Sequence, residues 1–238
     1  MSDLLFRQDA YRRSAPAQVV AHSDEGVVLD QCLFYPEGGG QPGDAGRLTW
    51  DGGAAEVATT RKGADGQPVL VLAEGADQPA VGTAVQQALN WDLRFGHMRV
   101  HTALHLLSVV LPFGVSGGSI GAQKGRLDFN MPEAPEDKLA VQAQLQALID
   151  RDLNVSESWI TDAELEANPG LVKTMSVSPP RGQGRVRLVR IGQGDEQIDL
   201  QPCGGTHVAS TAEIGQIRIG KIEKKGKQNR RVYLHLEG

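Results

Sequence analysis

The 238-residue sequence predicts an α+β protein, in which a small N-terminal β-barrel precedes a two-layer domain of helices on an antiparallel sheet. Three observations predict this order. Short β-branched runs between glycine-rich turns fill the chain to about residue 85, and helical periodicity replaces them from about residue 90. Strand-like runs then return after residue 185. The change of pattern at residues 73–90 predicts two domains, at residues 1–88 and 89–238.

The first domain is predicted to be a barrel because its strands are short and its turns are frequent. Strand-like runs occur at Gln18–Ala21, Gly26–Leu29 and Pro68–Leu72. Turn signals such as Asp51-Gly52-Gly53 and Asp65-Gly66-Gln67 lie between them. This spacing is typical of a closed or nearly closed sheet of short strands.

The second domain is predicted to begin with helices. Apolar residues and histidines recur at intervals of three and four from Leu93 to Leu107, and Pro112 ends the run. A second helix is predicted from about Glu136 to Leu153, and a short third one at Asp162–Ala167 with Thr161 as its N-cap. The predicted apolar face of the second helix consists of Leu139, Leu145, Leu148, Ile149 and Leu153.

Four strand-like runs follow the predicted helices, at Arg185–Ile191, Gln197–Leu200, Gly215–Lys221 and Arg231–Leu236. A lysine-rich turn joins the last two runs, which predicts an antiparallel hairpin. Helices followed by antiparallel strands favour an α+β arrangement over an alternating parallel one.

The net charge of −5 hides an uneven distribution of charge. Residues 1–170 carry 12 Lys and Arg against 23 Asp and Glu, whereas residues 171–238 carry 12 against 6. The densest basic stretch runs from Arg218 to Arg231 and contains one acid, Glu223. Such a stretch could bind the phosphate backbone of a nucleic acid. It could equally well protect an edge strand of a sheet against pairing with another chain. Charge alone leaves both readings open.

Composition also sets the expected compartment. No apolar run reaches the roughly 18 to 20 residues that a membrane helix needs, and the N-terminus lacks the pattern of a secretory signal. Only two cysteines occur, Cys32 and Cys203, so a disulfide framework is not expected. We predict a cytoplasmic protein without membrane contact, with Cys32 as a small core residue.

Two short motifs predict one tetrahedral Zn²⁺ site per chain. His101 and His105 are four residues apart on the first predicted helix, so both imidazoles project from one face. Cys203 and His207 flank Gly204-Gly205-Thr206, and the glycines let the backbone turn tightly enough for the two side chains to converge. Three imidazoles and one thiolate fit Zn²⁺ in ligand type and number.

Each motif alone has a simpler explanation, as a packed histidine pair or as a tight turn with a buried thiol. These simpler explanations account less well for both motifs occurring together, because the two motifs contain three of the six histidines of the chain. His97 is a weaker candidate for a fifth ligand. A zinc peptidase is disfavoured, because Thr102 stands where such an enzyme has a glutamate base. Ligands from a helix and a distant loop favour a catalytic ion over a structural one without deciding the matter.

Four stretches resemble the editing domain of alanyl-tRNA synthetase and its free-standing relatives, the AlaX-type alanyl-tRNA editing proteins. They are FYPEGGGQPGD at 34–44, RVHTALHLL at 99–107, GAQKGRLDF at 121–129 and CGGTHV at 203–208. The resemblance is to the longer, stand-alone members with an N-terminal β-barrel. It implies hydrolysis of the ester bond in tRNA(Ala) mischarged with serine or glycine, and it places the family's zinc ligands on the four predicted ligands.

The resemblance also implies roles for two further residues in catalysis. Thr102 matches a threonine implicated in recognising the hydroxyl of serine, and Gln123 matches a glutamine near the substrate. With alanine the partner of Thr102 would be missing, and an unmade buried hydrogen bond costs about 1–3 kcal/mol. The alternatives are a Thr102 hydroxyl bonded to its own helix backbone and a Gln123 on an exposed turn.

Mischarged tRNA(Ala) is the expected partner. The glycine-rich segment, with Gly38, Gly39, Gly40 and Gln41, is expected to accommodate the end of the tRNA. The predicted phosphate contacts from the basic stretch are Lys224, Lys225, Lys227 and Arg230. The sequence indicates no oligomeric state, and a monomer is compatible with it.

An aminoacyl ester is labile, so a Lewis-acidic ion and donors for the developing oxyanion suffice, without a carboxylate base in either motif. The sequence leaves open whether the ion activates water or positions the substrate. Two other functions also stay open: editing of Ser-tRNA(Thr), as in the related domain of threonyl-tRNA synthetase, and a non-catalytic tRNA-binding module stabilised by zinc. The GGGQPGD and CGGTHV strings favour the alanine branch.

Overall fold

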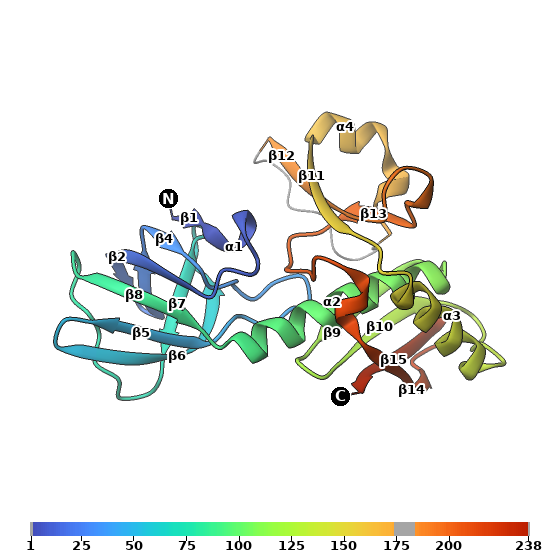
Figure 1. The fold of residues 1–238 in the computed structure, drawn as a ribbon, viewed down its shortest axis with the longest axis horizontal. Helices are drawn as coiled ribbons and strands as arrows, with labels where there is room; N and C mark the ends of the chain where they lie inside the picture. Colours follow the sequence, from blue (N-terminus) through green and yellow to red (C-terminus); the bar gives the residue numbers. More distant parts are fainter. Residues whose placement is uncertain (1, 174–183, 238) are drawn as a thin grey trace. The chain divides into compact units, whose positions relative to one another are not determined.

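The computed structural model describes residues 2–173 and 184–237, and the chain separates into two compact units, Met1–Gly96 and His97–Gly238 (Figure 1). The prediction of an α+β fold with a small N-terminal barrel and antiparallel sheets is confirmed. None of the helices in the described part of the chain combines the length and the apolar composition that a membrane span requires.

The first unit is a closed antiparallel barrel in which the strands follow the order β2, β3, β7, β6, β5, β8. The strands are β2 (Ser14–Ser23), β3 (Gly26–Leu29), β5 (Gly46–Trp50), β6 (Gly53–Lys62), β7 (Pro68–Leu72) and β8 (Ala84–Leu89). Alternate residues of β2, namely Ala15, Ala17 and Val19, are buried, as the two-residue period of a strand requires. β5 and β6 flank the predicted turn at Asp51-Gly52-Gly53.

Short elements complete the first unit. β1 (Asp3–Leu4) pairs in parallel with β4 (Gln31–Cys32), and α1 (Leu5–Gln8) follows β1. The barrel core consists mainly of Val, Leu and Ala side chains, with Phe34 as its largest member. Cys32 is part of this core, which confirms its predicted place.

The second unit contains a four-stranded antiparallel sheet in the order β14, β15, β10, β9. Its strands are β9 (Val115–Ile120), β10 (Lys124–Asn130), β14 (Gln216–Lys224) and β15 (Asn229–Glu237). Helix α2 (Trp91–Val110) ends before Pro112, as predicted. In the second unit α2 packs closely on β10, because a Cβ added at Gly125 would lie 2.6 Å from Val100 Cγ1. The β14–β15 hairpin matches the prediction, whereas the β9–β10 hairpin was not predicted.

Helix α3 (Lys138–Asp150) covers the edge of this sheet. Asp137 caps the helix, and the side-chain oxygens of Gln142 and Gln146 accept hydrogen bonds from the β14 backbone at 3.0 and 3.1 Å. Its buried residues are Val141, Leu145 and Ile149. The prediction that Leu139 belongs to the apolar face is wrong, since Leu139 is 69% exposed. The buried positions recur every four residues, and a residue two before Val141 lies on the opposite side of the helix.

A second, three-stranded antiparallel sheet supports the functional loop described below. Its order is β11 (Val155–Thr161), β12 (Arg185–Ile191) and β13 (Asp199–Pro202). Helix α4 (Asp162–Ala167) follows β11, and the predicted Thr161 cap is part of a capping box with Glu164. Three 3-10 turns complete the described part of the unit, η1 (Pro169–Leu171), η2 (Gly194–Glu196) and η3 (Thr211–Ile214).

Candidate metal centre

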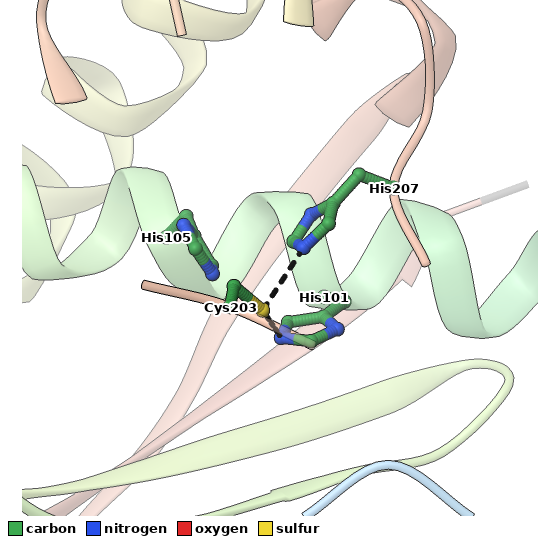
Figure 2. A group of neighbouring side chains, drawn as sticks. All are labelled: His101, His105, Cys203 and His207. Atoms are coloured by element: carbon green, nitrogen blue, oxygen red, sulfur yellow. Dashed lines mark hydrogen bonds between the residues drawn. The ribbon is translucent and has the colours of Figure 1, made fainter. Parts of the chain in front are cut away.

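Four side chains from two distant parts of the sequence converge within the second unit (Figure 2). His101 and His105 lie one turn apart on α2, and both are buried. Cys203 and His207 come from the segment that follows β13. Each residue offers one ligand atom, and these four atoms all lie within 4.8 Å of one another. The structure therefore brings together the four residues that the sequence grouped.

The side chain of Arg187 in β12 holds the loop that carries Cys203 and His207. The Nη1 atom of Arg187 donates to the carbonyl oxygens of Cys203 and Gly205, both at 2.8 Å. Its Nε atom donates to Glu157 of β11 at 2.7 Å. The turn between Cys203 and His207 is thus fixed by a buried side chain of the neighbouring strand, independently of any ion.

The distances within the cluster suit a small tetrahedral ion. Cys203 Sγ lies 3.2 Å from His207 Nε2 and 3.4 Å from His101 Nε2. With metal–ligand bonds of about 2.0–2.3 Å, a tetrahedral Zn²⁺ would place its ligand atoms roughly 3.3–3.6 Å apart. The ring centroids of the three histidines are 4.2 to 5.2 Å apart. The donor set of one sulfur and three nitrogens therefore fits Zn²⁺ in chemistry, and the two distances from Cys203 fit it in spacing. The four ligand atoms together, which lie within 4.8 Å of one another, would move closer around a bound ion.

The charges within the cluster also favour a cation. Burial raises the pKa of the Cys203 thiol, but the rings of His101 and His207 beside it outweigh this and hold that pKa well below its usual value. Burial and the neighbouring ring of His101 lower the pKa of His207 to about 3. Both directions favour the forms that bind a metal, which are a thiolate at Cys203 and a neutral imidazole at His207.

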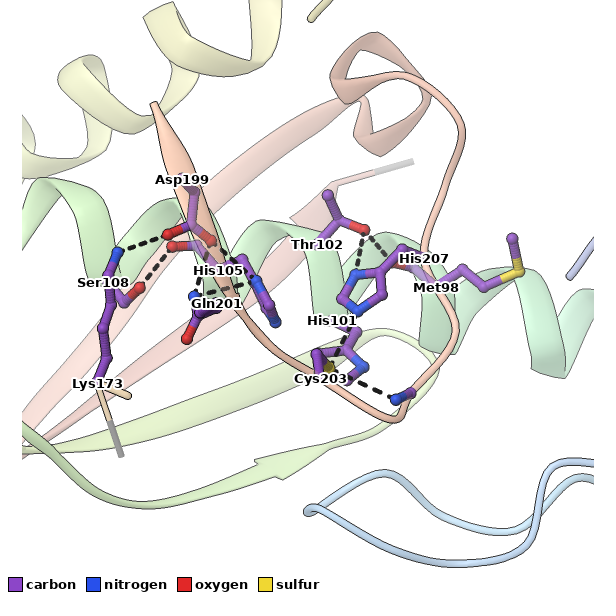
Figure 3. Close-up of polar contacts among 11 residues, drawn as sticks. Met98, His101, Thr102, His105, Ser108, Lys173, Asp199, Gln201, Cys203 and His207 are labelled. Carbon is purple, nitrogen blue, oxygen red and sulfur yellow. Dashed lines mark hydrogen bonds and ion pairs between the residues drawn. The ribbon is translucent and has the colours of Figure 1, made fainter. Parts of the chain in front are cut away.

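A buried polar network lies behind His105 (Figure 3). His105 Nδ1 is 3.0 Å from Asp199 Oδ2, and Asp199 Oδ1 accepts from Lys173 Nζ at 2.6 Å. Gln201 donates to Asp199 Oδ2 at 2.8 Å. Burial opposes ionisation of Asp199, but the hydrogen bond to His105 and the charge of Lys173 lower its pKa to about 2. For His105, burial lowers the pKa, but Asp199 and the Cys203 thiolate outweigh it and raise the value to about 9.

Asp199, Gln201 and Lys173 were not predicted from the sequence. The sequence does contain a pattern that could have indicated Asp199 and Gln201. Positions 199, 201 and 203 alternate, so in a strand their side chains face the same side as Cys203. Asp199 and Gln201 are both buried positions of β13, where alternate residues face the same side. Lys173 offers no such signal, since it follows the η1 turn in irregular chain.

Thr102 lies behind His207 and is fully buried. Its hydroxyl oxygen is 2.9 Å from Met98 O and 3.1 Å from His207 Nδ1 (Figure 3). The same oxygen accepts a hydrogen bond from Val208 N at 3.3 Å. Gln123, the other residue expected in catalysis, lies between β9 and β10 with its side chain exposed. Its carbonyl oxygen accepts from Leu236 N at 2.9 Å.

The glycine-rich segment belongs to the first unit, where it forms a tight turn. Gly38 and Gln41 exchange two backbone hydrogen bonds of 3.0 Å. Gly39 and Gly40 between them have φ angles of 60° and 83°, and both are exposed at the tip. Gln41 is buried. The exposed part of this segment is therefore backbone, which permits close approach of a ligand.

The residues of the basic stretch have different surroundings. Lys224, Lys225 and Lys227 are exposed at the β14–β15 turn, and Lys225 Nζ is 3.0 Å from Glu223. Arg230 is buried instead and donates to the carbonyl oxygens of Gly226 and Asn229, both at 3.0 Å, and of Pro132. Arg230 thus stabilises the turn on which the three exposed lysines lie.

Two family models match the chain. The model described as "Threonyl and Alanyl tRNA synthetase second additional domain" matches residues 186–233, which include the Cys203 loop. The model described as "tRNA synthetases class II (A)" matches residues 8–93, which are most of the first unit.

Full-length similarity is found to proteins named "Alanyl-tRNA editing protein AlaX-M". The protein of Methanosarcina acetivorans is 33% identical over 254 residues, covering 99% of this chain and 99% of its own length. That of Methanosarcina mazei is 31% identical over 247 residues, covering 99% and 97%. The "Alanine--tRNA ligase" of Pyrobaculum calidifontis is 37% identical over an alignment of 231 positions that covers 92% of this chain. The chain spans only 25% of the length of that ligase.

Proposed function

The chain belongs to the family of alanyl-tRNA editing proteins, and on that basis we propose that it hydrolyses the ester bond of mischarged tRNA(Ala). The proposed substrates are Ser-tRNA(Ala) and Gly-tRNA(Ala), with correctly charged Ala-tRNA(Ala) spared. The observation that carries this proposal is the cluster of the buried His101, His105 and His207 with the half-buried Cys203, in a chain that aligns with editing proteins over 99% of its length. Acting on tRNA, the protein would work in the cytoplasm.

We propose one Zn²⁺ per chain, bound by these four side chains. The bound ion would supply Lewis acidity for the ester carbonyl or for a water molecule. The chain's own contribution is the Cys203 sulfur and three imidazoles, of which His207 and His105 have their outer nitrogens held by Thr102 and Asp199. His105, whose pKa is raised to about 9, must release its other ring proton when the ion binds. The three histidines of the set are buried, which limits the access of bulk water to the ion, whereas Cys203 is half-buried.

The surroundings of the cluster argue against a carboxylate base. Among the described residues, Asp199 is the carboxylate with a hydrogen bond to the cluster, and its two oxygens are occupied by His105, Lys173 and Gln201. Its pKa of about 2 makes it a weak base at neutral pH. We propose that this chain does not use a side-chain carboxylate to remove a proton from water, and an activated ester makes this tolerable.

We propose further that the Gly38–Gln41 turn and the lysines at the β14–β15 turn bind the tRNA. Gly39 and Gly40 expose backbone, and Lys224 and Lys227 expose charge. Of the four residues proposed on this hairpin, Arg230 would act by holding the turn, because its guanidinium is buried. Gln123, exposed between β9 and β10, is proposed to contact the substrate end.

A second candidate substrate is Ser-tRNA(Thr), because the matched family model is shared by threonyl and alanyl synthetases. The test is hydrolysis of labelled Ser-, Gly- and Ala-tRNA(Ala) and Ser-tRNA(Thr) by the wild-type protein. We expect serine and glycine to be released from tRNA(Ala) and alanine to be retained. Preferential release from Ser-tRNA(Thr) would reassign the substrate.

The variant Cys203→Ala should abolish the activity, and its matched control is Cys32→Ala, the same substitution in the barrel core. Removal of metal with a chelator should act like Cys203→Ala, with activity restored by Zn²⁺. Tight tRNA binding without any hydrolysis by the wild-type protein would contradict the proposal and favour a non-catalytic tRNA-binding module.

A further inference from the structure

We propose that Thr102 is a positioning residue that orients His207 and fixes its ring proton on Nδ1, so that Nε2 faces the metal. Asp199 plays the matching part for His105. This inference rests on the proposed metal site, and it assigns Thr102 a task other than contact with the substrate.

The hydrogen-bonding capacity of Thr102 is used up inside the protein. A hydroxyl has one proton to donate and two lone pairs with which to accept. The Thr102 oxygen has three neighbours: Met98 O at 2.9 Å, His207 Nδ1 at 3.1 Å and Val208 N at 3.3 Å. Met98 O can only accept and Val208 N can only donate. With its proton on Met98 O, the hydroxyl presents its remaining lone pair to His207 Nδ1.

This arrangement selects the tautomer that a metal needs. A neutral imidazole carries one proton, and a ring that binds metal through Nε2 must carry that proton on Nδ1. His207 Nε2 is the nitrogen that faces Cys203 Sγ, at 3.2 Å, and Nδ1 is the nitrogen that faces Thr102. Thr102 therefore supplies the acceptor for the Nδ1–H proton of a metal-bound His207.

Asp199 does the same for His105 by different means. Its carboxylate only accepts hydrogen bonds, and Oδ2 lies 3.0 Å from His105 Nδ1. Lys173 and Gln201 hold the carboxylate in place. Partners of this kind, which bond the outer nitrogen of a histidine ligand, typically change metal affinity or activity by about 10–100-fold when removed. Because Thr102 and Asp199 are both buried, water does not readily replace either partner.

The chain offers a matched control in Thr211. Thr211 is fully buried, donates to Ile149 O at 3.0 Å and accepts from Leu153 N at 2.9 Å. It thus makes the same two kinds of backbone hydrogen bond as Thr102, but its hydroxyl does not meet an imidazole within the described residues. Thr102→Val and Thr211→Val remove the same atom from similar surroundings, and they differ in the contact with His207.

The experiment measures Zn²⁺ affinity by competition with a chromophoric chelator. We expect Thr102→Val to weaken Zn²⁺ binding by about 10–100-fold, and Thr102→Ser to restore it to within a few-fold of wild type. Thr211→Val should bind Zn²⁺ like the wild type, even if it unfolds at a lower temperature. Equal Zn²⁺ affinity of Thr102→Val and wild type would overturn the proposal.

Hydrolysis gives a second readout that separates positioning from recognition. If Thr102 acts through His207, Thr102→Val lowers kcat for Ser-tRNA(Ala) and Gly-tRNA(Ala) by the same factor. A loss confined to Ser-tRNA(Ala) would show that Thr102 reads the serine hydroxyl, and it would overturn the proposal. The Zn²⁺ measurement needs no tRNA, so failure of the proposed deacylase function would leave its result interpretable.

Discussion

Arg94 and Asp44 form an ion pair that is fully buried within the first unit. Arg94 Nε donates to Asp44 Oδ2 at 2.9 Å, and its other nitrogens donate to the carbonyl oxygens of Ala10 and Leu33. Tyr35 N donates to the same Asp44 oxygen at 2.6 Å. The pair therefore anchors both ends of the segment from Tyr35 to Asp44, which contains the glycine-rich turn.

Breaking this pair should destabilise the protein strongly. Asp44→Ala leaves the buried Arg94 charge without its partner, and we expect a loss of about 3–5 kcal/mol in the free energy of unfolding. The control is Glu56→Ala, which removes the partner of Arg47 from an exposed pair in the same barrel and should cost less than about 1 kcal/mol. Urea denaturation measures both. Similar losses in the two variants would contradict the structural role of the buried pair.

The two cysteines should differ sharply in reactivity. Cys32 is fully buried and its pKa is raised to about 12 by burial, whereas Cys203 is half-buried and its pKa is lowered by the histidine rings beside it. At neutral pH iodoacetamide should therefore modify Cys203 of the metal-free native protein and leave Cys32 intact. Zn²⁺ should protect Cys203. Peptide mapping by mass spectrometry distinguishes the sites, and modification of Cys32 without unfolding would refute this prediction.

Alkaline pH should weaken the barrel through Cys32. The thiol ionises near pH 9.0 in the unfolded chain and near 12 in the folded one, so the unfolded state loses its proton first. The contribution of the protonated thiol is therefore fully present below pH 9 and is lost between pH 9 and 12, by up to about 1.4 kcal/mol per pH unit. The stability difference between wild type and Cys32→Ala, measured with urea under reducing conditions, should shrink accordingly from pH 8 to 10.5. A constant difference would exclude this linkage.

Two glycines of the same segment should respond differently to alanine. At Gly43 an added Cβ would lie 2.0 Å from Thr60 O, so Gly43→Ala must displace backbone. At Gly39 an added Cβ would meet no described atom within 4 Å, and the cost of about 1–2 kcal/mol comes from the left-handed backbone at its φ of 60°. We expect Gly43→Ala to lower the melting temperature far more than Gly39→Ala. If the turn accommodates the tRNA end, Gly39→Ala should instead raise the KM for tRNA.

Charge reversal at the β14–β15 turn tests the proposed tRNA binding. Reversing Lys224, Lys225 and Lys227 to Glu should raise the KM and weaken the dependence of binding on salt, by about one unit of slope for each phosphate that is no longer neutralised. Lys138→Glu, an exposed lysine at the start of α3, is the control and should change neither. An unchanged salt profile in the triple variant would leave these lysines as protection of the sheet edge.

The sequence predicted the parts of the centre that depend on local spacing. An interval of four on a helix, and two glycines between Cys203 and His207, each determine the direction of two side chains. The partners of those side chains depend on packing between distant segments. The two-residue spacing of Asp199, Gln201 and Cys203 places them on one face of a strand, but it does not say which side chains they meet. That His105 meets Asp199 and that His207 meets Thr102 follows from how β13 and its loop lie against α2.

The fold shows the same division. Strands with continuous apolar residues, such as Gly26–Leu29 and Pro68–Leu72, were predicted with their bounds. The β9–β10 hairpin was not predicted, because Gly117 and Gly118 interrupt the alternation in its first strand. Leu139 was wrongly assigned to the buried face because its side chain is apolar. Which face of α3 is buried depends on how the helix packs against the sheet, and that face consists of Val141, Leu145 and Ile149.

The division of the proposed metal centre between two distant segments has a consequence for the order of events in biosynthesis. Residues 106–202 separate the histidine pair on α2 from the Cys203 loop. A growing chain that has exposed only the first pair offers two imidazoles, too few for a stable tetrahedral site. Closing so long a loop around an ion costs chain entropy. In the folded protein this cost no longer opposes metal binding, because folding has already brought the Cys203 loop close to α2. With the proposed Zn²⁺ as the bound ion, we therefore expect the metal to be acquired after synthesis, by the folded molecule.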